Sequence, residues 1–334
     1  IFDGSGHCWR PVKKYKMTER QWAHLINSGG VLDESKRIWW PNEEALNGQR
    51  RLEELLAEEA PLEDYDEVRT YLRPRLLQLI NCRNILLDGP TFQNSPMWNL
   101  HPLLCENIII RSIFVRNAWY SQNGDGLDVE SCRNVLVEDS IFDVGDDAIC
   151  LKSGKDEMGR KIGVPTEQVL IRNCTVYHGH GGFVIGSEMS GGVRNAAVKN
   201  CQFIGTDVGL RFKSTRGRGG VVEDISIEQI DMINIEGPAI IFDLYDFTDT
   251  NSEQIPEVSI ETPQFRNVSF DQIICRGVDI GIFLRGLPEM PLKNLEFNRV
   301  MMTANNGVSI TNSENHQFNQ VTITDVEGNI LFNK

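Results

Sequence analysis

The sequence lacks any long hydrophobic run and has far fewer basic than acidic residues. No stretch approaches the roughly 18 apolar residues that a membrane-spanning helix needs, so we expect no membrane partner. The 33 lysines and arginines are outnumbered by 47 aspartates and glutamates, and the net charge is −14. Nucleic acid is not an expected partner, because phosphate contacts need a surplus of basic side chains on one surface. An acidic substrate would need a local basic patch for the same reason.

Two further features are missing. The eight cysteines include no Cys-x-x-Cys pair, so we expect no zinc site. We also expect no cofactor. Residues 1–6 lack the charged segment and apolar run of a signal peptide. These residues are typical of a strand end followed by a turn, and we expect the first structural repeat to be incomplete.

A short repeat organises most of the chain. It consists of Asn or a similar polar residue, an aliphatic residue, any residue, an apolar residue and then a polar one. Nine copies begin at Asn84, Asn107, Asn134, Gln168, Asn195, Asp224, Asn267, Asn294 and Gln320, at spacings of 23 to 43 residues. Alternation with period two indicates strands, and the spacing indicates one solenoid coil per copy with insertions where it lengthens.

A second strand follows in most coils and carries the same alternation. Its copies begin at Gly126, Ala148, Gly182, Gly209, Ala239, Gly281 and Gly307. Large apolar residues at alternate positions would point inward and stack as ladders between parallel strands about 4.8 Å apart. We therefore predict one all-β solenoid domain over residues 1–334.

The cysteines fall into columns of this repeat. Cys82, Cys105 and Cys132 occupy equivalent positions, and Cys174 and Cys201 share another column. We interpret them as small apolar residues stacked in the interior. A disulfide between neighbouring coils is the alternative.

The N-terminal part of the chain differs from the repeat. Residues 18–21 form a capping box, which predicts a helix ending near residues 29–30. Residues 42–59 show helical leucine spacing, and the acidic residues 58–66 are predicted to form a solvated loop. We expect residues 17–60 to be a helical insertion in the first coil.

Charged side chains fall into register at the start of the second strands. Asp125 aligns with Asp147, and Asp146 aligns with His180. Outward-facing positions of four neighbouring coils bring together Asp125, Asp146, Asp147, His180, Lys152, Arg211 and Lys213. Stacked carboxylates repel one another, which costs stability and favours a functional explanation over ordinary turn residues.

Paired carboxyl groups suit glycoside hydrolysis. One protonates the leaving oxygen, and another activates water or attacks carbon. Carboxyl groups about 6.5–9.5 Å apart indicate inversion, whereas about 5–5.5 Å indicates retention. Arg211 and Lys213 suit a substrate that itself carries carboxylates.

Four ordered motifs carry a family resemblance. Residues 123–126 (Asn-Gly-Asp-Gly), 145–147 (Gly-Asp-Asp), 179–181 (Gly-His-Gly) and 211–213 (Arg-Phe-Lys) resemble the signatures of the polygalacturonase family of glycoside hydrolases. The resemblance covers roughly residues 75–330. Gly124 replaces the usual Thr and Phe212 the usual Ile, and neither change removes a reacting group.

The resemblance implies a single-stranded right-handed parallel β-helix and metal-independent, inverting hydrolysis of α-1,4-galacturonosyl linkages in pectin. Asp146 would be the general acid, and Asp125 and Asp147 would activate water. His180 would support protonation of the acid. Arg211 and Lys213 would hold the sugar carboxylate.

The resemblance also extends to substrate contacts and mode of action. Tyr245 matches a subsite tyrosine, and a packing role is the alternative. Apart from the resemblance, the positions of Lys152, His101 and Trp98 near the predicted cleft make them further predicted contacts, and a cap on a coil is the alternative for Trp98. The basic loops at residues 152–161 and 215–218 resemble exo-acting bacterial members, and the insertion at 17–60 would wall off one end of the groove. A polymeric plant cell-wall substrate implies a periplasmic or secreted protein, which we expect to be a monomer.

Three alternatives remain open at this point. A rhamnogalacturonan or other pectic side-chain hydrolase would use the same acids with different subsites. A β-helix pectate lyase would use the acidic cluster to hold Ca²⁺. A non-catalytic carbohydrate-binding solenoid would not need the aspartates for turnover.

Overall fold

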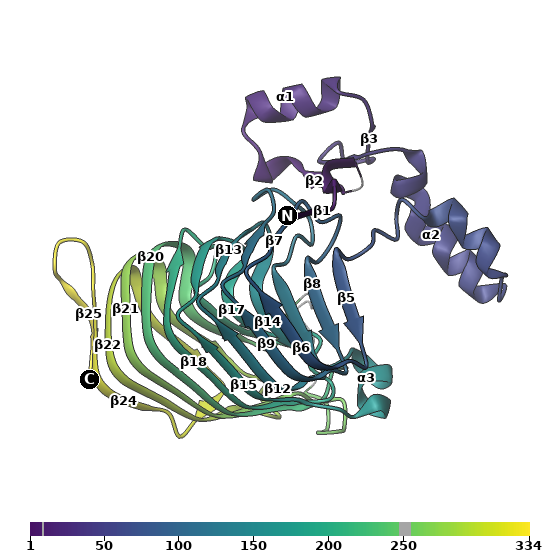
Figure 1. Cartoon of the computed structure of the whole chain (residues 1–334). Coiled ribbons are helices and arrows are strands. Elements are labelled where there is room, and N and C mark those ends of the chain that lie inside the picture. The colour runs from purple at the N-terminus through teal and green to yellow at the C-terminus, as the bar shows by residue number, and fades with distance from the viewer. Residues whose placement is uncertain (9, 247–254) are drawn as a thin grey trace.

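The chain winds into a parallel β-helix whose coils stack along one axis (Figure 1). The computed structural model describes residues 1–8, 10–246 and 255–334. Face A of the β-helix contains the second strand of each coil: β5 (Leu77–Ile80), β8 (Leu100–Leu103), β11 (Leu127–Glu130), β14 (Asp147–Lys152), β17 (Gly181–Ile185) and β19 (Leu210–Lys213). Every pairing along this face is parallel, as the repeat predicted.

Two further faces complete each coil. Face B contains the repeat itself, in β6 (Arg83–Asp88), β9 (Glu106–Arg111), β12 (Arg133–Glu138) and β15 (Thr166–Arg172). Face C contains β1 (Phe2–Asp3), β7 (Thr91–Gln93), β10 (Phe114–Arg116), β13 (Ile141–Val144) and β16 (Thr175–His178). Later strands run over more than one face without a break: β18 (Val193–Ile204), β20 (Val221–Asp243), β21 (Gln264–Arg285) and β22 (Leu292–Thr311).

The asparagine that opens most copies has a backbone reason. All nine predicted starting residues have φ between 53° and 59°, the left-handed region that Asn tolerates better than most residues. Their side chains also bond between coils: Asn107 Nδ2 donates to Asn84 Oδ1 at 3.0 Å, and Asn134 Nδ2 to Asn107 Oδ1 at 2.8 Å. The repeat therefore marks a backbone bend in each coil, and hydrogen bonds between the stacked asparagine side chains reinforce it.

The predicted start of the ninth repeat copy, Gln320, is wrong. Asn294 is matched across the coils by Asn315, not by Gln320, because β24 (Gln317–Thr324) pairs Phe318 with Phe297 and Val321 with Val300. The last coil is shorter than the sequence suggested, and Gln320 occupies the bend after that of Asn315. β23 (Ser313–Glu314) adds to face B, and β25 (Ile330–Asn333) pairs antiparallel with β24 at the C-terminal end.

The interior is a continuous apolar core of stacked side chains. Phenylalanines form part of it: Phe212 stacks on Phe242 with ring centroids 4.2 Å apart, and Phe270 on Phe297 at 4.9 Å. Cys105 and Cys132 are buried, and each thiol sulfur accepts the backbone N–H of the coil before it, at 3.3 and 3.4 Å. All seven cysteines whose side chains are described are free, so the disulfide alternative is wrong for them.

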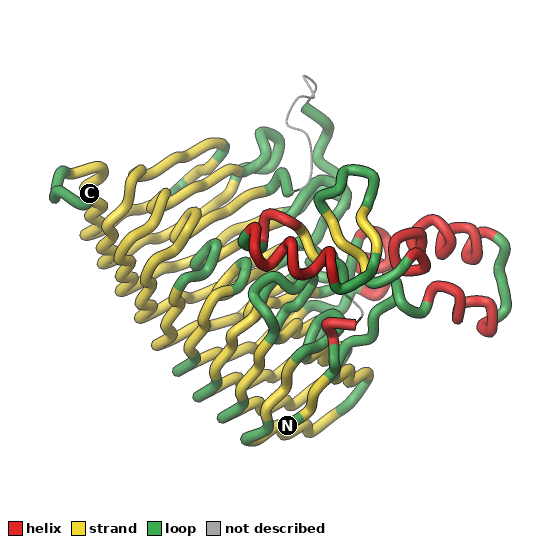
Figure 2. Tube along the Cα trace, turned by 90° about the horizontal axis from the view of Figure 1, so that it is seen from above, coloured by secondary structure: helices red, strands yellow, loops and turns green. Residues whose placement is uncertain are grey.

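The N-terminal excursion projects beside one end of the β-helix (Figures 1 and 2). It comprises η1 (Gly6–Cys8), β2 (Val12–Lys13), η2 (Lys14–Lys16), α1 (Glu19–Asn27), β3 (Val31–Leu32), β4 (Ile38–Trp40), α2 (Glu43–Ala57) and η3 (Leu62–Val68). The Thr18–Gln21 capping box and both predicted helices are confirmed. The acidic stretch is not all loop, because η3 occupies its second half. Within the described residues, no helix is long and apolar enough to cross a membrane.

Candidate active site

Three aspartates meet at the start of two neighbouring strands of face A. Asp125 lies two residues before β11, Asp146 immediately precedes β14, and Asp147 begins it. One carboxylate oxygen from each lies within 4.8 Å of those of the other two. Asp125 and Asp147 are buried, whereas Asp146 is half-buried. The predicted aspartate cluster is therefore present, and Asp146 is its most accessible member.

Tight turns place this cluster. A Cβ atom on Gly124 would lie 1.9 Å from Ser121 Oγ, so the Thr found in the family motif would clash with Ser121 in its present position. A Cβ on Gly145 would lie 2.5 Å from Ala118 O. Gly124 thus allows Ser121 to pack closely against the turn.

Backbone amides and an arginine hold Asp146 and its neighbour Asn123. The amides of Asn123 and Asp147 donate to Asp146 Oδ2 and Oδ1, each at 3.1 Å. Arg73 Nη2 donates to Asn123 Oδ1 at 2.9 Å, and Arg73 Nη1 donates to Gln122 O, also at 2.9 Å. Arg73 follows η3 and carries no repeat signal, so sequence reasoning missed it.

The environments of Asp147 and Asp125 drive their pKa values apart. Burial alone would raise the pKa of Asp147. Two cations, Lys213 and Arg211, outweigh burial and hold that pKa well below its usual range; Lys213 Nζ lies 2.9 Å from Asp147 Oδ2. Burial raises the pKa of Asp125 well above its usual range, and neighbouring carboxylates, Asp128 first among them, raise it further. The surroundings thus favour the ionised form of Asp147 and the protonated form of Asp125.

His180 is oriented by a carboxylate of the next coil. Its Nδ1 lies 2.6 Å from Asp207 Oδ2, and its backbone N–H donates to Asp146 O at 3.0 Å. A proton on Nδ1 satisfies the bond to Asp207 and leaves Nε2 without a hydrogen-bond partner among the described residues. The imidazole is thereby fixed at the edge of the aspartate cluster.

These groups line one pocket of about 230 Å³. The Arg211 guanidinium forms an ion pair with Asp246, in which Nη2 lies 3.6 Å from Oδ1. The lining residues are Lys13, Tyr15, Lys16, Trp98, Gln122, Asn123, Asp125, Asp146, Asp147, Lys152, His180, Ser187, Glu188, Arg211 and Lys213. The structure thus brings together all four predicted catalytic residues and four of the six predicted substrate contacts, which are Trp98, Lys152, Arg211 and Lys213.

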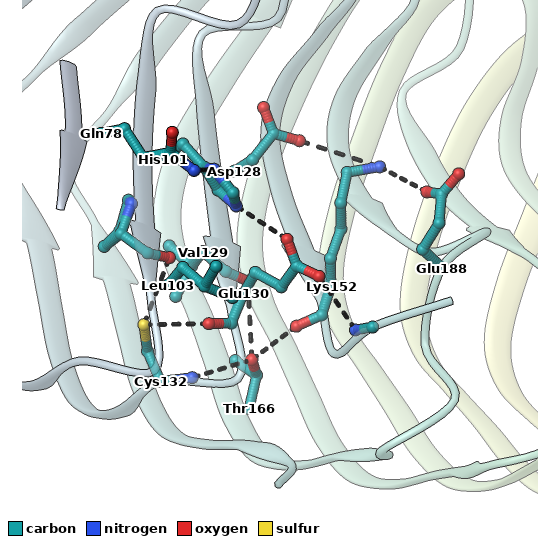
Figure 3. Close-up of polar contacts among 12 residues, drawn as sticks. Gln78, His101, Leu103, Asp128, Val129, Glu130, Cys132, Lys152, Thr166 and Glu188 are labelled. Atoms are coloured by element: carbon teal, nitrogen blue, oxygen red, sulfur yellow. Dashed lines mark hydrogen bonds and ion pairs between the residues drawn. The ribbon is translucent and has the colours of Figure 1, made fainter. Parts of the chain in front are cut away.

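A buried polar cluster extends from the pocket toward earlier coils (Figure 3). Lys152 Nζ lies 2.8 Å from Glu188 Oε2 and 3.7 Å from Asp128 Oδ1. Neither oxygen of Asp128 accepts a hydrogen bond from the described residues, and burial raises the pKa of Asp128 well above its usual range despite Lys152. Lys152 reaches the pocket, but its ammonium group is already engaged.

His101 belongs to the same cluster and does not line the pocket. Its Nδ1 lies 3.1 Å from Gln78 Nε2, and its Nε2 lies 2.7 Å from Glu130 Oε2 (Figure 3). The side chain is only 2% exposed. The predicted substrate contact is therefore corrected: His101 lies outside the pocket lining, with its ring perpendicular to that of Trp98, which lines the pocket.

Tyr245 also lies outside the pocket lining. The guanidinium groups of Arg216 and Arg285 each lie 5.2 Å from its ring centroid. The packing alternative describes this arrangement better than the subsite prediction, because cationic groups of two other segments already contact the ring.

The two predicted basic loops are largely engaged with each other. Arg160 donates to the carbonyl groups of Gly217 and Arg218, and Arg218 pairs with Asp156 in α3 (Asp156–Ile162). Lys161 pairs with Glu157 at 2.8 Å. Of the cations in these loops, Lys152 lines the pocket and Arg160 and Arg218 join the two loops, whereas Arg216 pairs with Glu289.

The aspartate cluster has the donor set of a cation site. Carboxylate oxygens are the ligands that hard divalent cations prefer. One oxygen of Asp147 is already bound by Lys213, and an ammonium group beside the cluster opposes cation binding electrostatically. Asp125, Asp146 and Asp147 would be the ligands of any such ion.

Comparison with known proteins agrees with this geometry. Residues 67–280 match the model of glycosyl hydrolases family 28. A probable polygalacturonase of Vitis vinifera is 31% identical over 231 residues, which cover 69% of this chain and 46% of that protein. An exo-poly-alpha-D-galacturonosidase of Dickeya chrysanthemi is 30% identical over 179 residues, covering 54% of this chain and 29% of that protein.

A solved structure adds the fold. The hyperthermoactive exopolygalacturonase of Thermotoga maritima is similar with a TM-score of 0.71 and 35% identity, covering 85% of this chain and 61% of that one. The chain thus spans about half the length or less of these curated relatives. The family match includes both aspartate turns, His180, Arg211 and Lys213. This chain belongs to family 28 of the glycosyl hydrolases.

Proposed function

We propose that this protein hydrolyses α-1,4-galacturonosyl linkages of pectic polygalacturonate. The observation that carries the proposal is the placement of three carboxyl groups with Lys213 and Arg211 in one pocket. A galacturonate unit presents a carboxylate next to the bond to be broken, and the guanidinium and ammonium groups supply its counter-charges. The names of the similar proteins support the same substrate class.

The catalytic roles follow from exposure and charge. Asp146 is the accessible carboxyl group and acts as general acid toward the leaving oxygen. Asp147 is ionised beside Lys213 and accepts the proton of the attacking water, which Asp125 helps to position. Asp125 Oδ1 and Asp147 Oδ1 are buried and accept no hydrogen bond from the described residues, so each keeps an acceptor for that water. His180 supports protonation of the acid, and its Nε2 is free of hydrogen bonds to the described residues for this role.

We propose further that the enzyme attacks chain ends and acts outside the cytoplasm. The excursion places Tyr15 and Lys16 in the pocket wall, where they would obstruct a polymer threading across it. A polymeric substrate that does not cross a cell membrane supports a periplasmic or secreted location. The decisive test is digestion of polygalacturonate with sizing of the products over time. Monomer or dimer from the first minutes is the expected result, whereas a ladder of long oligomers would contradict the exo mode.

Two controls separate this function from its alternatives. Rhamnogalacturonan should be cleaved much more slowly than polygalacturonate if the substrate assignment is right. The clustered oxygens of Asp125, Asp146 and Asp147 favour a Ca²⁺-dependent lyase as the second candidate. A lyase releases unsaturated products that absorb in the ultraviolet, and its activity disappears on chelation. We expect saturated products and full activity in EDTA.

A further inference from the structure

With a net charge of −14, the protein as a whole repels an anionic sugar, and the predicted basic loops do not supply free cations to attract one. An anionic sugar must be attracted by local cations, yet Arg160, Lys161 and Arg218 are held by loop contacts. Within the pocket, Lys152 is paired with Glu188 and Lys213 with Asp147. The cations predicted from the repeat therefore already have acidic partners.

A short basic segment of the excursion enters the same pocket. Lys13, Tyr15 and Lys16, from β2 and η2, line it together with the catalytic aspartates. We call residues 13–16 the strap. Lys16 Nζ donates to Gly145 O at 2.8 Å, which pins the strap beside Asp146. Tyr15 is 75% exposed and lies under the Lys13 ammonium group, 5.9 Å from ring centroid to Nζ.

The strap is held in place by a small core of its own. Val12, Trp22 and Trp39 are buried together, and Tyr120 of the β-helix packs against them. β2 pairs antiparallel with β4, so Lys13 is opposite Ile38. Because Val12 points into this core, the next side chain, Lys13, points the other way, into the pocket. The strap is thus a fixed element rather than a surface tail.

Among the described residues, Lys13 and Lys16 are the pocket cations without a carboxylate partner, and Lys16 is already bound to Gly145 O, which leaves the Lys13 ammonium group unengaged by any acidic group. No carboxylate of the described residues lies within ion-pair distance of its Nζ, whereas the neighbouring Lys14 pairs with Glu19 at 3.3 Å. The strap also separates this pocket from a second one of about 220 Å³, which Tyr15 and Lys16 line together with Trp119 and Asp207. A sugar bound beside Asp146 would therefore meet Lys13 and the face of Tyr15 at its edge.

We infer that the strap is a substrate-binding element in which Lys13 binds the carboxylate of a uronate unit and the Tyr15 ring covers that sugar. This inference rests on the proposed function and adds a carboxylate contact separate from Arg211 and Lys213. An ammonium group is a strong partner for a carboxylate. An aromatic ring supplies an apolar surface for the sugar face.

The test measures binding of trigalacturonate by calorimetry in the inactive Asp146→Asn background. Lys13→Gln should weaken binding about tenfold, the loss of one charge-assisted contact. Lys14→Gln is the matched control, because it removes an adjacent charge that lines neither pocket, and it should bind like the parent. Lys13→Arg keeps the cation and should restore most of the affinity. Fully methyl-esterified trigalacturonate should not distinguish Lys13→Gln from the parent.

The outcomes separate the two proposals. Equal trigalacturonate affinity for the Lys13→Gln variant and its parent would overturn the strap inference, as would an equal loss with the esterified ligand. Failure of the wild-type protein to cleave polygalacturonate, with no trigalacturonate binding by the parent, would instead overturn the proposed function. If Lys13→Gln lowers the midpoint of thermal unfolding, its weaker binding could reflect lost folding, so trigalacturonate binding is measured in the Tyr15→Ala variant instead. Weakened binding at an unchanged midpoint supports the strap, and unchanged binding overturns it.

Discussion

Lys213 Nζ lies 2.9 Å from Asp147 Oδ2, so one buried ammonium group contacts the proposed catalytic base and is also the proposed partner of the substrate carboxylate. Asp147 is 2% exposed and would have a raised pKa if burial acted alone. Lys213, with Arg211, reverses that effect and favours the ionised form of Asp147. The ion pair thus stabilises the charged form that the proposed role of Asp147 as base requires.

The first prediction concerns this pair and the pH profile. In Lys213→Met, burial is opposed by fewer cations, so the pKa of Asp147 rises and the base is protonated at a higher pH. The acidic limb of the kcat/KM profile should therefore move to higher pH. Lys213→Arg retains a positive charge and should leave the limb near its original position. An unmoved limb in Lys213→Met would show that Asp147 is not the titrating base.

The second prediction concerns the catalytic carboxyl groups. Asp125→Asn, Asp146→Asn and Asp147→Asn should each lower kcat by about 10²–10⁴-fold, the usual contribution of a positioned acid or base. Asp143→Asn is the control, since Asp143 belongs to the same coil but pairs with His178, 3.0 Å away, and does not line the pocket. A non-catalytic sugar-binding protein would show no turnover to lose.

The third prediction concerns stereochemistry. The closest carboxylate oxygens lie within 4.8 Å, nearer than the roughly 6.5–9.5 Å typical of inverting enzymes. The family resemblance nevertheless implies inversion, and three carboxyl groups allow two to hold a water while the third acts as acid. We expect the β-anomer to be released first from the α-linkage, as observed by proton NMR within the first turnovers. Initial release of the α-anomer would instead assign a covalent intermediate to Asp125 or Asp147.

The fourth prediction concerns Asp128 and stability. Burial raises its folded-state pKa, so the folded protein binds more protons than the unfolded chain between the two pKa values, and stability falls as pH rises through that window. Asp128→Asn removes this dependence. It should stabilise the protein by roughly 1–3 kcal/mol at pH 7 and by little near pH 4, as measured by denaturant unfolding. A destabilised variant at pH 7 would mean that the Lys152 contact outweighs burial.

The fifth prediction concerns the bend of each coil. Asn134 has φ of 57° and donates to Asn107 Oδ1. Asn134→Ala should lower the unfolding free energy by about 1–2 kcal/mol, because alanine is strained in the left-handed region and loses the bond. Asn134→Gly loses the same bond without the strain and should cost less. Equal losses in the two variants would assign the effect to the hydrogen bond alone.

The β-helix was predictable because a solenoid contacts itself at a nearly constant sequence interval. Asp147 pairs with Gly181 across the strands, and Arg211 with Val184, as the alignment of copies predicted. The alignment failed at the C-terminal end, where Asn315 replaces Gln320 in the column of Asn294. A short final coil leaves two bends with similar sequence, and only the pairing of β24 with β22 distinguishes them.

Side chains beyond the columns were predicted less well. His101 and Tyr245 have residue types suited to sugar contacts, yet neighbouring polar or cationic groups engage both. Alignment of the repeat copies predicts which coil and which face a residue occupies. It does not report whether its polar atoms already have partners, which depends on side chains from several coils.

By itself, the sequence determined the coil, its parallel strands and the outward column of Asp125, Asp146, Asp147 and His180, because alternation and spacing are local properties of the chain. Only the tertiary structure showed which segment of the chain packs against those residues. Lys16 meets Gly145 across 129 residues, through an excursion held by Val12, Trp39 and Tyr120 that follows no period. Contacts of this kind arise from shape complementarity between the excursion and the β-helix, and no spacing in the chain encodes them.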